Sequence, residues 1–243
     1  MITSEKTQRH RAIWQKKRIL QLVYTRWYQK ILEDLSRFDT PTLEIGAGIG
    51  NFKSFHRRII ASDIQFCSWL NLCQDAHRLP FKKNTISNIV MIDVLHHLSD
   101  PLMFFQEASR ILRKHGKIIL IEPYPSLLSL FVYRKFHPEP FLMDKDYFLA
   151  SDDGGKNPWE SNQAIAYLLF FKFRKKFLSR FGDDFKLVKV NRMCSILYPA
   201  SGGFEGRSFI PDFLIPLFMA AEAIFAPLRY FTAFRAYIAI RKK

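Results

Sequence analysis

The sequence predicts an α/β fold in which a doubly wound, parallel sheet carries helices on both faces. Short apolar segments alternate with helical segments between residues 41 and 123, which is the pattern of such a sheet. A turn with three closely spaced glycines, Gly46, Gly48 and Gly50, follows the first apolar segment. The chain has 243 residues, of which 48% are hydrophobic, so it can bury the core of one elaborated domain.

The first 40 residues predict an N-terminal helical extension, and residues 41–243 predict a domain with its core motifs within 41–123. Apolar side chains at helical spacing between residues 5 and 38 predict one long helix with a basic side. We expect this helix to pack beside the sheet, with a lid or a membrane contact as the alternative.

The first part of the sheet is expected to have five strands, at residues 42–45, 59–62, 69–73, 88–92 and 117–121. The best-marked helix between them covers residues 101–114. Asp100 can cap the start of this helix and Gly116 can end it.

The second part of the domain is less regular. Residues 124–160 are rich in proline and predict an irregular segment, and residues 161–181 predict a helix. A sixth strand is expected over 185–198. The alternating pattern of residues 233–240 predicts a final antiparallel edge strand.

An apolar helix, residues 209–225, interrupts this pattern inside an insertion at about residues 199–232. Asp212 and Glu222 are its only charges, so we expect it to be buried in the core or to lie in lipid. Its prolines and its short length argue against a membrane span, which needs roughly 20 apolar residues.

The charge of the chain limits its partners. The formal net charge is +15, and 24 residues are phenylalanine. Basic and aromatic character together indicate nucleic acid, an anionic membrane surface or an anionic substrate, or simply a basic solvated surface over a Phe-rich core. The three cysteines form no C-x-x-C pair and the N-terminus does not look like a signal peptide. We therefore expect a cytoplasmic protein, at most resting on the inner face of a membrane.

The glycine turn and two acids form the most specific pattern. Such a turn exposes backbone N–H groups and has no side chains to block a ligand. Glu44 precedes the first glycine, where a carboxylate can face a positively charged ligand group. Asp63 follows the next apolar segment, where an acid can bridge two ribose hydroxyls. The fingerprint of a dinucleotide site requires a small residue where Asn51 stands, which opposes an NAD enzyme.

This pattern resembles the class I S-adenosylmethionine-dependent methyltransferases, most closely the type-11 subgroup that includes the quinone-ring C-methyltransferases. The resemblance covers about residues 41–123 and rests on five motifs in the expected order. They are Leu43-Glu-Ile-Gly-Ala-Gly-Ile-Gly50, Ala61-Ser-Asp-Ile64, Asp75-Ala-His-Arg-Leu-Pro-Phe81, Ile89-Val-Met-Ile-Asp-Val-Leu-His-His-Leu98 and Leu112-Arg-Lys-His-Gly-Lys-Ile-Ile-Leu120. It implies a Rossmann-like, seven-stranded sheet with an antiparallel last strand, and S-adenosylmethionine as the cofactor.

The resemblance also implies a cofactor site. Its residues would be Glu44, Gly46, Ala47, Gly48, Gly50, Asp63, Ile64, Asp75, Ala76 and Asp93. The residues up to Gly50, with the region of Asp93, would line the methionine end of the cofactor. Asp63 would hold the ribose, and Ile64 would flank the adenine. Asp75 would accept from the adenine amino group and the Ala76 N–H would meet the ring, with turn capping as the alternative for Asp75. The helix that usually follows Asp63 in this family is nearly lost here, so the N-terminal helix is expected to rebuild the adenine side.

Two adjacent histidines follow the fourth predicted strand, at the sheet edge where α/β proteins bind ligands. Methyl transfer from a sulfonium needs positioning and, for some acceptors, removal of a proton. His96 or His97 could take that proton, because an unperturbed histidine titrates near neutrality. Adjacent histidines with no acid or cysteine set nearby do not match the usual metal-ligand spacing, so no metal is expected. Glu122 and Tyr124 face the same edge as further substrate contacts.

The function that follows is methyl transfer from S-adenosylmethionine to an oxygen or carbon of a small-molecule acceptor, preferably an apolar or lipid-linked one. The apolar insertion would cover that acceptor or touch a membrane. Two alternatives remain. A nucleic-acid methyltransferase is favoured by the charge, but the target-base motif that such enzymes carry after the fourth strand is missing. A non-catalytic, membrane-associated protein that keeps the fold is the other.

Overall fold

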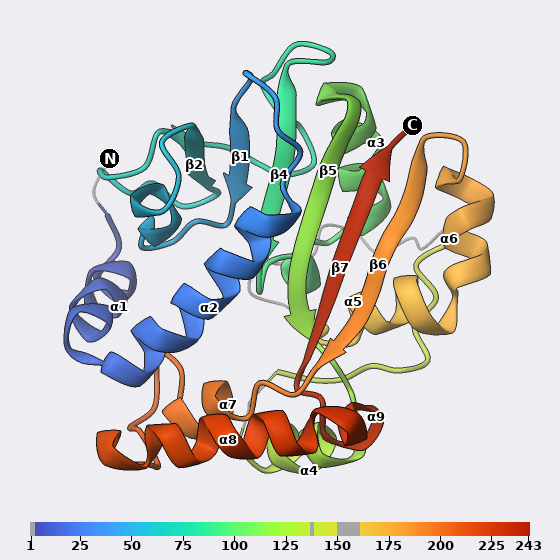
Figure 1. The fold of residues 1–243 in the computed structure, drawn as a ribbon. Helices are drawn as coiled ribbons and strands as arrows, with labels where there is room; N and C mark the ends of the chain where they lie inside the picture. The colour runs from blue at the N-terminus through green and yellow to red at the C-terminus, as the bar shows by residue number, and fades with distance from the viewer. Residues whose placement is uncertain (1–2, 137–138, 150–160) are drawn as a thin grey trace.

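The computed structural model describes residues 3–136, 139–149 and 161–243, which form a seven-stranded sheet with helices on both faces (Figure 1). The strands are β1 (Thr42–Ile45), β2 (Ile59–Asp63), β3 (Leu72–Cys73), β4 (Ile86–Ile92), β5 (Leu112–Pro123), β6 (Phe185–Met193) and β7 (Arg235–Lys242). Their order in the sheet is β3-β2-β1-β4-β5-β7-β6. The predicted α/β fold with seven strands is therefore confirmed.

The first five strands run parallel, and β1 lies between β2 and β4. The strand order reverses between β1 and β4, which makes this point the topological switch of the sheet. The ends of these two strands lie side by side, because Ile45 pairs with Met91. The glycine turn and the histidine pair follow these two ends, so the fold brings them to one edge.

Strand β7 is antiparallel to both of its neighbours, as the sequence predicts for the last strand. Its predicted place at the sheet edge is wrong. β7 lies between β5 and β6, and β6 forms the edge instead. Residues 235–240 are buried, which is why this strand is an almost continuous apolar run rather than an alternating one.

The helices are α1 (Glu5–Lys16), α2 (Arg18–Asp34), α3 (Pro101–Ile111), α4 (Leu127–Phe136), α5 (Ile165–Tyr167), α6 (Arg174–Phe181), α7 (Leu197–Ser201), α8 (Ile215–Phe225) and α9 (Arg229–Thr232). The short turns η1 (Asn51–Ser54), η2 (Leu95–His97), η4 (Asp212–Leu214) and η5 (Ala226–Leu228) are 3-10 helical, and η3 (Leu168–Lys172) is π-helical. One buried cluster joins α3, α5 and α6 to the sheet, and a second joins α2 and α7 to its opposite face.

The N-terminal segment consists of two helices rather than the one long helix that its periodicity predicts. The break is at Lys17, whose backbone leaves the helical region with φ −102° and ψ 88°. Its Nζ donates to the carbonyls of Gly203 (2.7 Å) and Gly206 (2.9 Å). α2 packs its apolar side, including Val23 and Ile31, onto the sheet. α1 turns away toward β2 (Figure 1).

Helix α3 starts where the sequence predicts, because Asp100 Oδ1 accepts from Leu102 N and Met103 N. It ends at Ile111 rather than at residue 114, since Leu112 already begins β5. The predicted helix over residues 161–181 is present, but η3 divides it into α5 and α6.

Three other boundaries need correction. β3 is only Leu72–Cys73, because a turn closed by Leu70 N and Cys67 O occupies the preceding residues. The segment expected to be irregular contains α4. β6 ends at Met193, and Ser195, with φ of +42°, redirects the chain into α7.

The apolar insertion forms a continuous helical run over Asp212–Thr232. This run has 21 residues and a mean hydropathy of 1.4 over its most apolar window, so by length and composition it could cross a membrane, contrary to the sequence prediction. Only 11% of that window is buried, so the expected core role is also wrong. Figure 1 shows α8 and α9 crossing the end of the sheet toward which β5 points, with α4 beside them.

Candidate functional site

The turn after β1 adopts the backbone conformation that favours glycine. Gly46, Gly48 and Gly50 have φ angles of +71°, +49° and +73°. A Cβ at Gly46 would lie 2.2 Å from a methyl carbon of Val94, so a larger residue does not fit there. A Cβ at Gly48 would meet nothing within 4 Å. The turn therefore presents its backbone to open space at Gly48, as a ligand cradle requires.

Glu44 is buried within β1, two residues before this turn. Its Oε2 accepts no hydrogen bond from any residue that the structure describes. Burial, together with the nearby charge of Asp63, raises the pKa of Glu44 to about 8. Because a buried acceptor without a donor is costly, the positive end of a ligand is the partner that this carboxyl lacks.

Asp63 stands at the end of β2, beside the glycine turn. Its Oδ2 accepts from Gly48 N at 2.9 Å, and its Oδ1 accepts from Gln65 N at 3.0 Å. A carboxylate has about four lone-pair sites, so these two bonds fix its orientation and leave capacity for ligand hydroxyls. Ile64 follows with 53% of its surface exposed, which leaves an apolar face next to the acid.

The short segment after Asp63 is supported by the N-terminal residues. Ser4 Oγ donates to Gln65 Oε1 at 3.3 Å. Ser68 N donates to Thr3 Oγ1 at 3.1 Å. The start of α1 thus packs where the family's usual helix is missing, in agreement with the sequence expectation.

Trp69 belongs to the same wall, although no sequence pattern pointed to it. Its Nε1 donates to Gly48 O at 3.0 Å, and its ring lies close to Gly50. Arg11 of α1 lies over the ring, with its guanidinium carbon 4.5 Å from the ring centroid. The indole therefore ties α1 to the glycine turn. A single tryptophan in a short loop carries no periodic signal that could have identified it.

Asp75 caps the turn that follows β3. Its Oδ1 accepts from His77 N at 2.9 Å and pairs with His77 Nδ1 at 2.6 Å. This is the capping role that the sequence left open as the alternative. The contact of Asp75 with an adenine amino group, and that of the buried Ala76 with the ring, stay predictions.

Asp93 follows β4 directly and has a left-handed backbone, with φ of +56°. Its Oδ1 pairs with Arg235 Nη1 of β7 at 2.5 Å. Arg235 is buried under the rings of Trp27 and Tyr198, and the charge of Asp93 holds its guanidinium protonated. Arg235 could not be recognised from the sequence, because it stands in a strand whose apolar pattern indicates only core packing.

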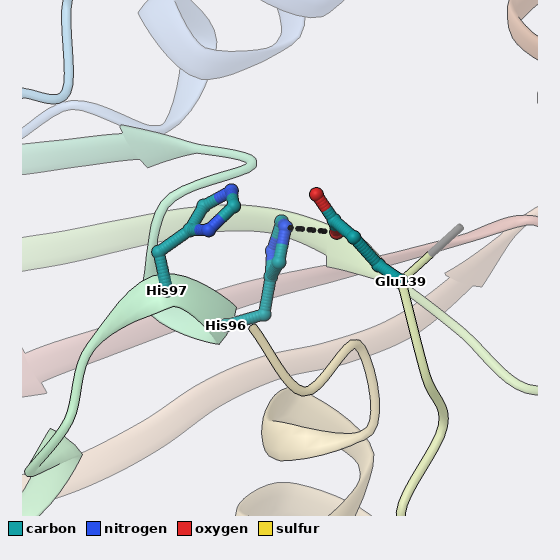
Figure 2. Close-up of side chains that lie close together, drawn as sticks. All are labelled: His96, His97 and Glu139. Atoms are coloured by element: carbon teal, nitrogen blue, oxygen red, sulfur yellow. Dashed lines mark ion pairs between the residues drawn. The ribbon is translucent and has the colours of Figure 1, made fainter. Parts of the chain in front are cut away.

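His96 is buried in η2 and lies between the carboxylates of Glu122 and Glu139, of which Figure 2 shows that of Glu139. Its Nδ1 is 2.6 Å from Glu122 Oε2, and its Nε2 is 3.5 Å from Glu139 Oε2. Although burial opposes the charge, the two acids raise the pKa of His96 to about 10. As a protonated imidazolium, His96 has no lone pair to act as the proton acceptor that the sequence suggested.

Glu122 of β5 is fully buried, and its Oε1 also accepts from Val94 N (2.9 Å) and Leu95 N (2.7 Å). The imidazolium of His96 and these backbone donors hold the pKa of Glu122 below its usual value. Glu122 therefore orients η2 and the His96 ring, and contacts no open space where a substrate could lie.

His97 is half-buried and stays neutral, because burial and the neighbouring charge of His96 lower its pKa to about 4. Its ring is tilted against that of His96, with centroids 4.2 Å apart. Glu139 lies on the other side of His96, and this imidazolium holds the pKa of Glu139 well below its usual range.

The sequence analysis expected no acid near the histidine pair and therefore no metal. The structure brings Glu139 to them from the segment that follows α4, so that His96, His97 and Glu139 offer three ligand atoms within 4.8 Å of one another. The sequence could not reveal this, because Glu139 lies in a proline-rich segment with no motif of its own.

Comparison with protein families gives one match: the model described as "Methyltransferase domain" matches residues 43–120, about a third of the chain. This segment contains the glycine turn, Asp63 and the histidine pair. Comparison with curated protein sequences gave no match.

Solved structures share the fold at low sequence identity. An S-adenosylmethionine-dependent methyltransferase from Archaeoglobus fulgidus has a TM-score of 0.54 and 18% identity, over 96% of this chain and 98% of that one. The putative methyltransferase of Haloferax volcanii, in complex with a methyltransferase activator, has a TM-score of 0.53 and 13% identity, over 97% and 93%. Geranyl diphosphate C-methyltransferase from Streptomyces coelicolor, in complex with Mg²⁺, geranyl diphosphate and S-adenosyl-L-homocysteine, has a TM-score of 0.50 and 12% identity, over 90% and 81%.

Proposed function

We propose that the chain is a class I S-adenosylmethionine-dependent methyltransferase, and that it methylates an apolar or lipid-linked small molecule at an anionic membrane surface. The observation that carries this proposal is the apolar helical layer at the carboxyl edge of the sheet. The acceptor atom, an oxygen or a carbon, belongs to the proposal as well.

The cofactor fits the residues that the fold assembles. Glu44, with its buried acceptor, would receive the ammonium of the methionine end, and the backbone of Gly46–Gly50 would lie along it. Asp63 would hold the ribose hydroxyls. When bound, S-adenosylmethionine supplies an electrophilic methyl group on its sulfonium. The contribution of the chain is to fix the acceptor in line with that group and to exclude water, because positioning supplies much of the rate in such a displacement.

Helix α8 is oriented as a membrane-facing helix would be. Its buried side chains are Ile215 and Glu222, and the carboxylate of Glu222 pairs with Arg26 at 2.8 Å and accepts from Leu197 N at 2.9 Å. Leu217, Ile224 and Phe225 are exposed, whereas Phe218 and Met219 pack partly against the core. The exposed apolar residues of α4, α8, α9 and the flanking turns, which we call the apolar layer, are Leu127, Leu128, Phe131, Phe209, Phe213, Leu217, Ile224, Phe225, Leu228, Tyr230 and Phe231.

An apolar surface of this size on a water-facing helix indicates a partner. Basic side chains next to the apolar layer favour an anionic membrane as that partner. They are Arg134, Lys135, Arg207 and Arg229, all exposed. The buried Ile215 and the pairing of Glu222 with Arg26 attach α8 to the domain at two places, so we propose that the run lies in the interface rather than across the membrane.

The position of the apolar layer links it to the chemistry. β5 points toward α8 and α9 in Figure 1, and α4 follows β5 after a short connection. Because ligands of open α/β sheets bind at the carboxyl ends of the strands, a substrate in the outer part of a membrane would reach the site from this side.

Calorimetry tests the cofactor part of the proposal. We expect micromolar binding of S-adenosylhomocysteine to the wild-type protein, no binding of NADH, and loss of S-adenosylhomocysteine binding in Asp63→Ala. Absence of binding to the wild type would overturn the site assignment.

Vesicle co-sedimentation tests the membrane part. We expect the protein to sediment with vesicles of phosphatidylserine and phosphatidylcholine, and the double variant Phe213→Asp/Leu217→Asp to stay in the supernatant. Leu178→Asp, on the exposed side of α6, is the matched control and should bind as the wild type does. Transfer of a labelled methyl group to lipid extract but not to RNA would support the acceptor class. The reverse result would favour a nucleic-acid substrate instead.

A further inference from the structure

We infer that His96, His97 and Glu139 form a binding site for one divalent transition-metal cation of the zinc type, with one coordination position open to an acceptor oxygen. The metal site itself follows from the geometry of these residues. Only the role of the open position rests on the proposed function.

The distances between the three side chains suit a shared cation. Their ligand atoms all lie within 4.8 Å of one another, and Figure 2 shows the three side chains gathered side by side. His96 Nε2 and Glu139 Oε2 are 3.5 Å apart. This is longer than a usual N–H···O hydrogen bond, which spans about 2.7 to 3.2 Å. It matches the edge of a tetrahedron with metal–ligand bonds of about 2.1 Å, which is about 3.4 Å.

A further carboxylate already orients the first ligand. Glu122 Oε2 is 2.6 Å from His96 Nδ1, so the Nε2 of the same ring is directed toward Glu139. The backbone N–H groups of Val94 and Leu95 hold Glu122 in place. A carboxylate that binds the remaining nitrogen of a histidine ligand is the usual companion of a metal site. A cation that binds Nε2 would displace the proton that the imidazolium carries there, while Nδ1 keeps its proton on Glu122.

The ligand types indicate the class of metal. Two imidazoles and one carboxylate suit zinc and the neighbouring divalent transition metals, whereas calcium and magnesium prefer all-oxygen sets. Three protein ligands are also typical of a catalytic site, which keeps its fourth position for water or substrate. His97 and Glu139 are only partly buried, so that position is accessible.

The location of the metal site near the methionine end of the cofactor suggests what the open coordination position would bind. Asp93, which follows β4 in the region expected to line the methionine end of the cofactor, offers an oxygen within 4.8 Å of His96 and Glu122 ligand atoms. A hydroxyl of the acceptor bound to the cation would release its proton to water more readily, because a bound cation lowers the pKa of an oxygen ligand. The lone pair of that oxygen would then form the bond to the methyl carbon, and the electrons of the broken carbon–sulfur bond would stay on sulfur. The inferred substrate class is therefore an acceptor with a hydroxyl group.

Metal binding can be measured without any substrate. Protein stripped with a chelator would be dialysed against Zn²⁺, and the bound metal counted by mass spectrometry. Co²⁺ titration would report the coordination geometry through its visible absorption. We expect one equivalent to bind to the wild type, and at least tenfold weaker binding in His97→Gln and in Glu139→Gln. His56→Gln removes a histidine in the loop before β2, and this control should bind as the wild type does.

The same samples separate this inference from the proposed function. We expect S-adenosylhomocysteine to bind equally to the wild type, His97→Gln and Glu139→Gln, which also shows that the variants are folded. If the cofactor product binds but no stoichiometric metal does, the metal site is wrong and the methyltransferase assignment stands. A second result would also overturn the metal site: the wild type binds no metal, yet His97→Gln loses methyl transfer. His97 would then act on the substrate directly.

Discussion

Arg235 Nη1 lies 2.5 Å from Asp93 Oδ1, which ties the start of β7 to the end of β4 across β5. Arg235 is 3% exposed and cannot exchange this partner for water. The pair fixes the short segment between β4 and the histidines of η2. It is therefore the link between the last strand of the sheet and the cofactor side of the site.

Loss of the Asp93–Arg235 ion pair should lower the stability of the folded protein. We expect Arg235→Met to lower the free energy of unfolding by about 3–5 kcal/mol, because it leaves the Asp93 carboxylate buried without its partner. Urea denaturation measures the change. Arg241→Met, on the exposed end of the same strand, should cost less than about 0.5 kcal/mol. The double variant Asp93→Asn/Arg235→Met should recover part of the loss. No recovery would mean that the pair contributes through packing alone.

The glycine turn offers a matched pair of substitutions. Gly46→Ala places a methyl group 2.2 Å from Val94 at a φ of +71°, so we expect loss of S-adenosylhomocysteine binding and a lower melting temperature. Gly48→Ala has the same backbone strain but open space, so it should cost only about 1–2 kcal/mol of stability. Equal effects of the two changes on stability would contradict the steric account.

The raised pKa of Glu44 makes the stability of the cofactor-free protein depend on pH. The folded protein holds the Glu44 proton up to about pH 8, whereas the unfolded chain loses it near the ordinary glutamate pKa of 4.5. The contribution of Glu44 to the free energy of unfolding is therefore fully present below pH 4.5 and is lost as the pH rises to about 8. We expect Glu44→Gln to remove that part of the pH dependence in urea denaturation between pH 5 and 8.

Cofactor binding should show the opposite dependence at the same residue. A deprotonated Glu44 pairs with the ligand ammonium, so S-adenosylhomocysteine should bind more tightly as the pH rises from 6 to 8. Glu44→Gln should bind at least tenfold more weakly and lose this trend. A wild-type affinity that does not change over that range would contradict the role given to Glu44.

The basic residues beside the apolar layer predict a dependence on lipid charge. Each cation near an anionic membrane contributes about 1 kcal/mol, so Arg134→Gln/Lys135→Gln should weaken binding to phosphatidylserine vesicles by about 30-fold. Binding to neutral vesicles should not change. Lys82→Gln/Lys83→Gln neutralises two exposed lysines before β4, at the opposite end of the sheet, and should have little effect. Equal losses in both double variants would indicate attraction by net charge alone.

The fold was largely predictable because its signals are local. Alternating apolar segments identify the parallel strands, and Asp100 marks the start of α3 by capping it. The interior position of β7 in the sheet was not predictable in the same way. An apolar strand has the same sequence pattern whether it pairs with a neighbouring strand on one side or on both sides. The break at Lys17 depends on carbonyls of Gly203 and Gly206, which are remote in sequence.

The site shows the same limit. Glu44 and the glycines share one motif and Asp63 belongs to the next, so they could be found together. The charge state of His96 could not, because it depends on Glu122 and Glu139, which reach the ring from two other segments. The exposure of α8 could not be predicted either, since the same apolar sequence can form a helix in a core or on a surface.

Strands β6 and β7 pair along their whole length, whatever the chain between them does. The entropy of closing such a loop grows only slowly, by about 0.6 kcal/mol for each doubling of its length. The part of this connection beyond α7 carries the residues of the apolar layer from Phe209 onward. It can therefore lengthen, shorten or change its chemistry at little thermodynamic cost to the sheet. In evolutionary terms, the proposed membrane attachment would be an exchangeable accessory in this architecture, and a relative could lose it while keeping the same catalytic frame.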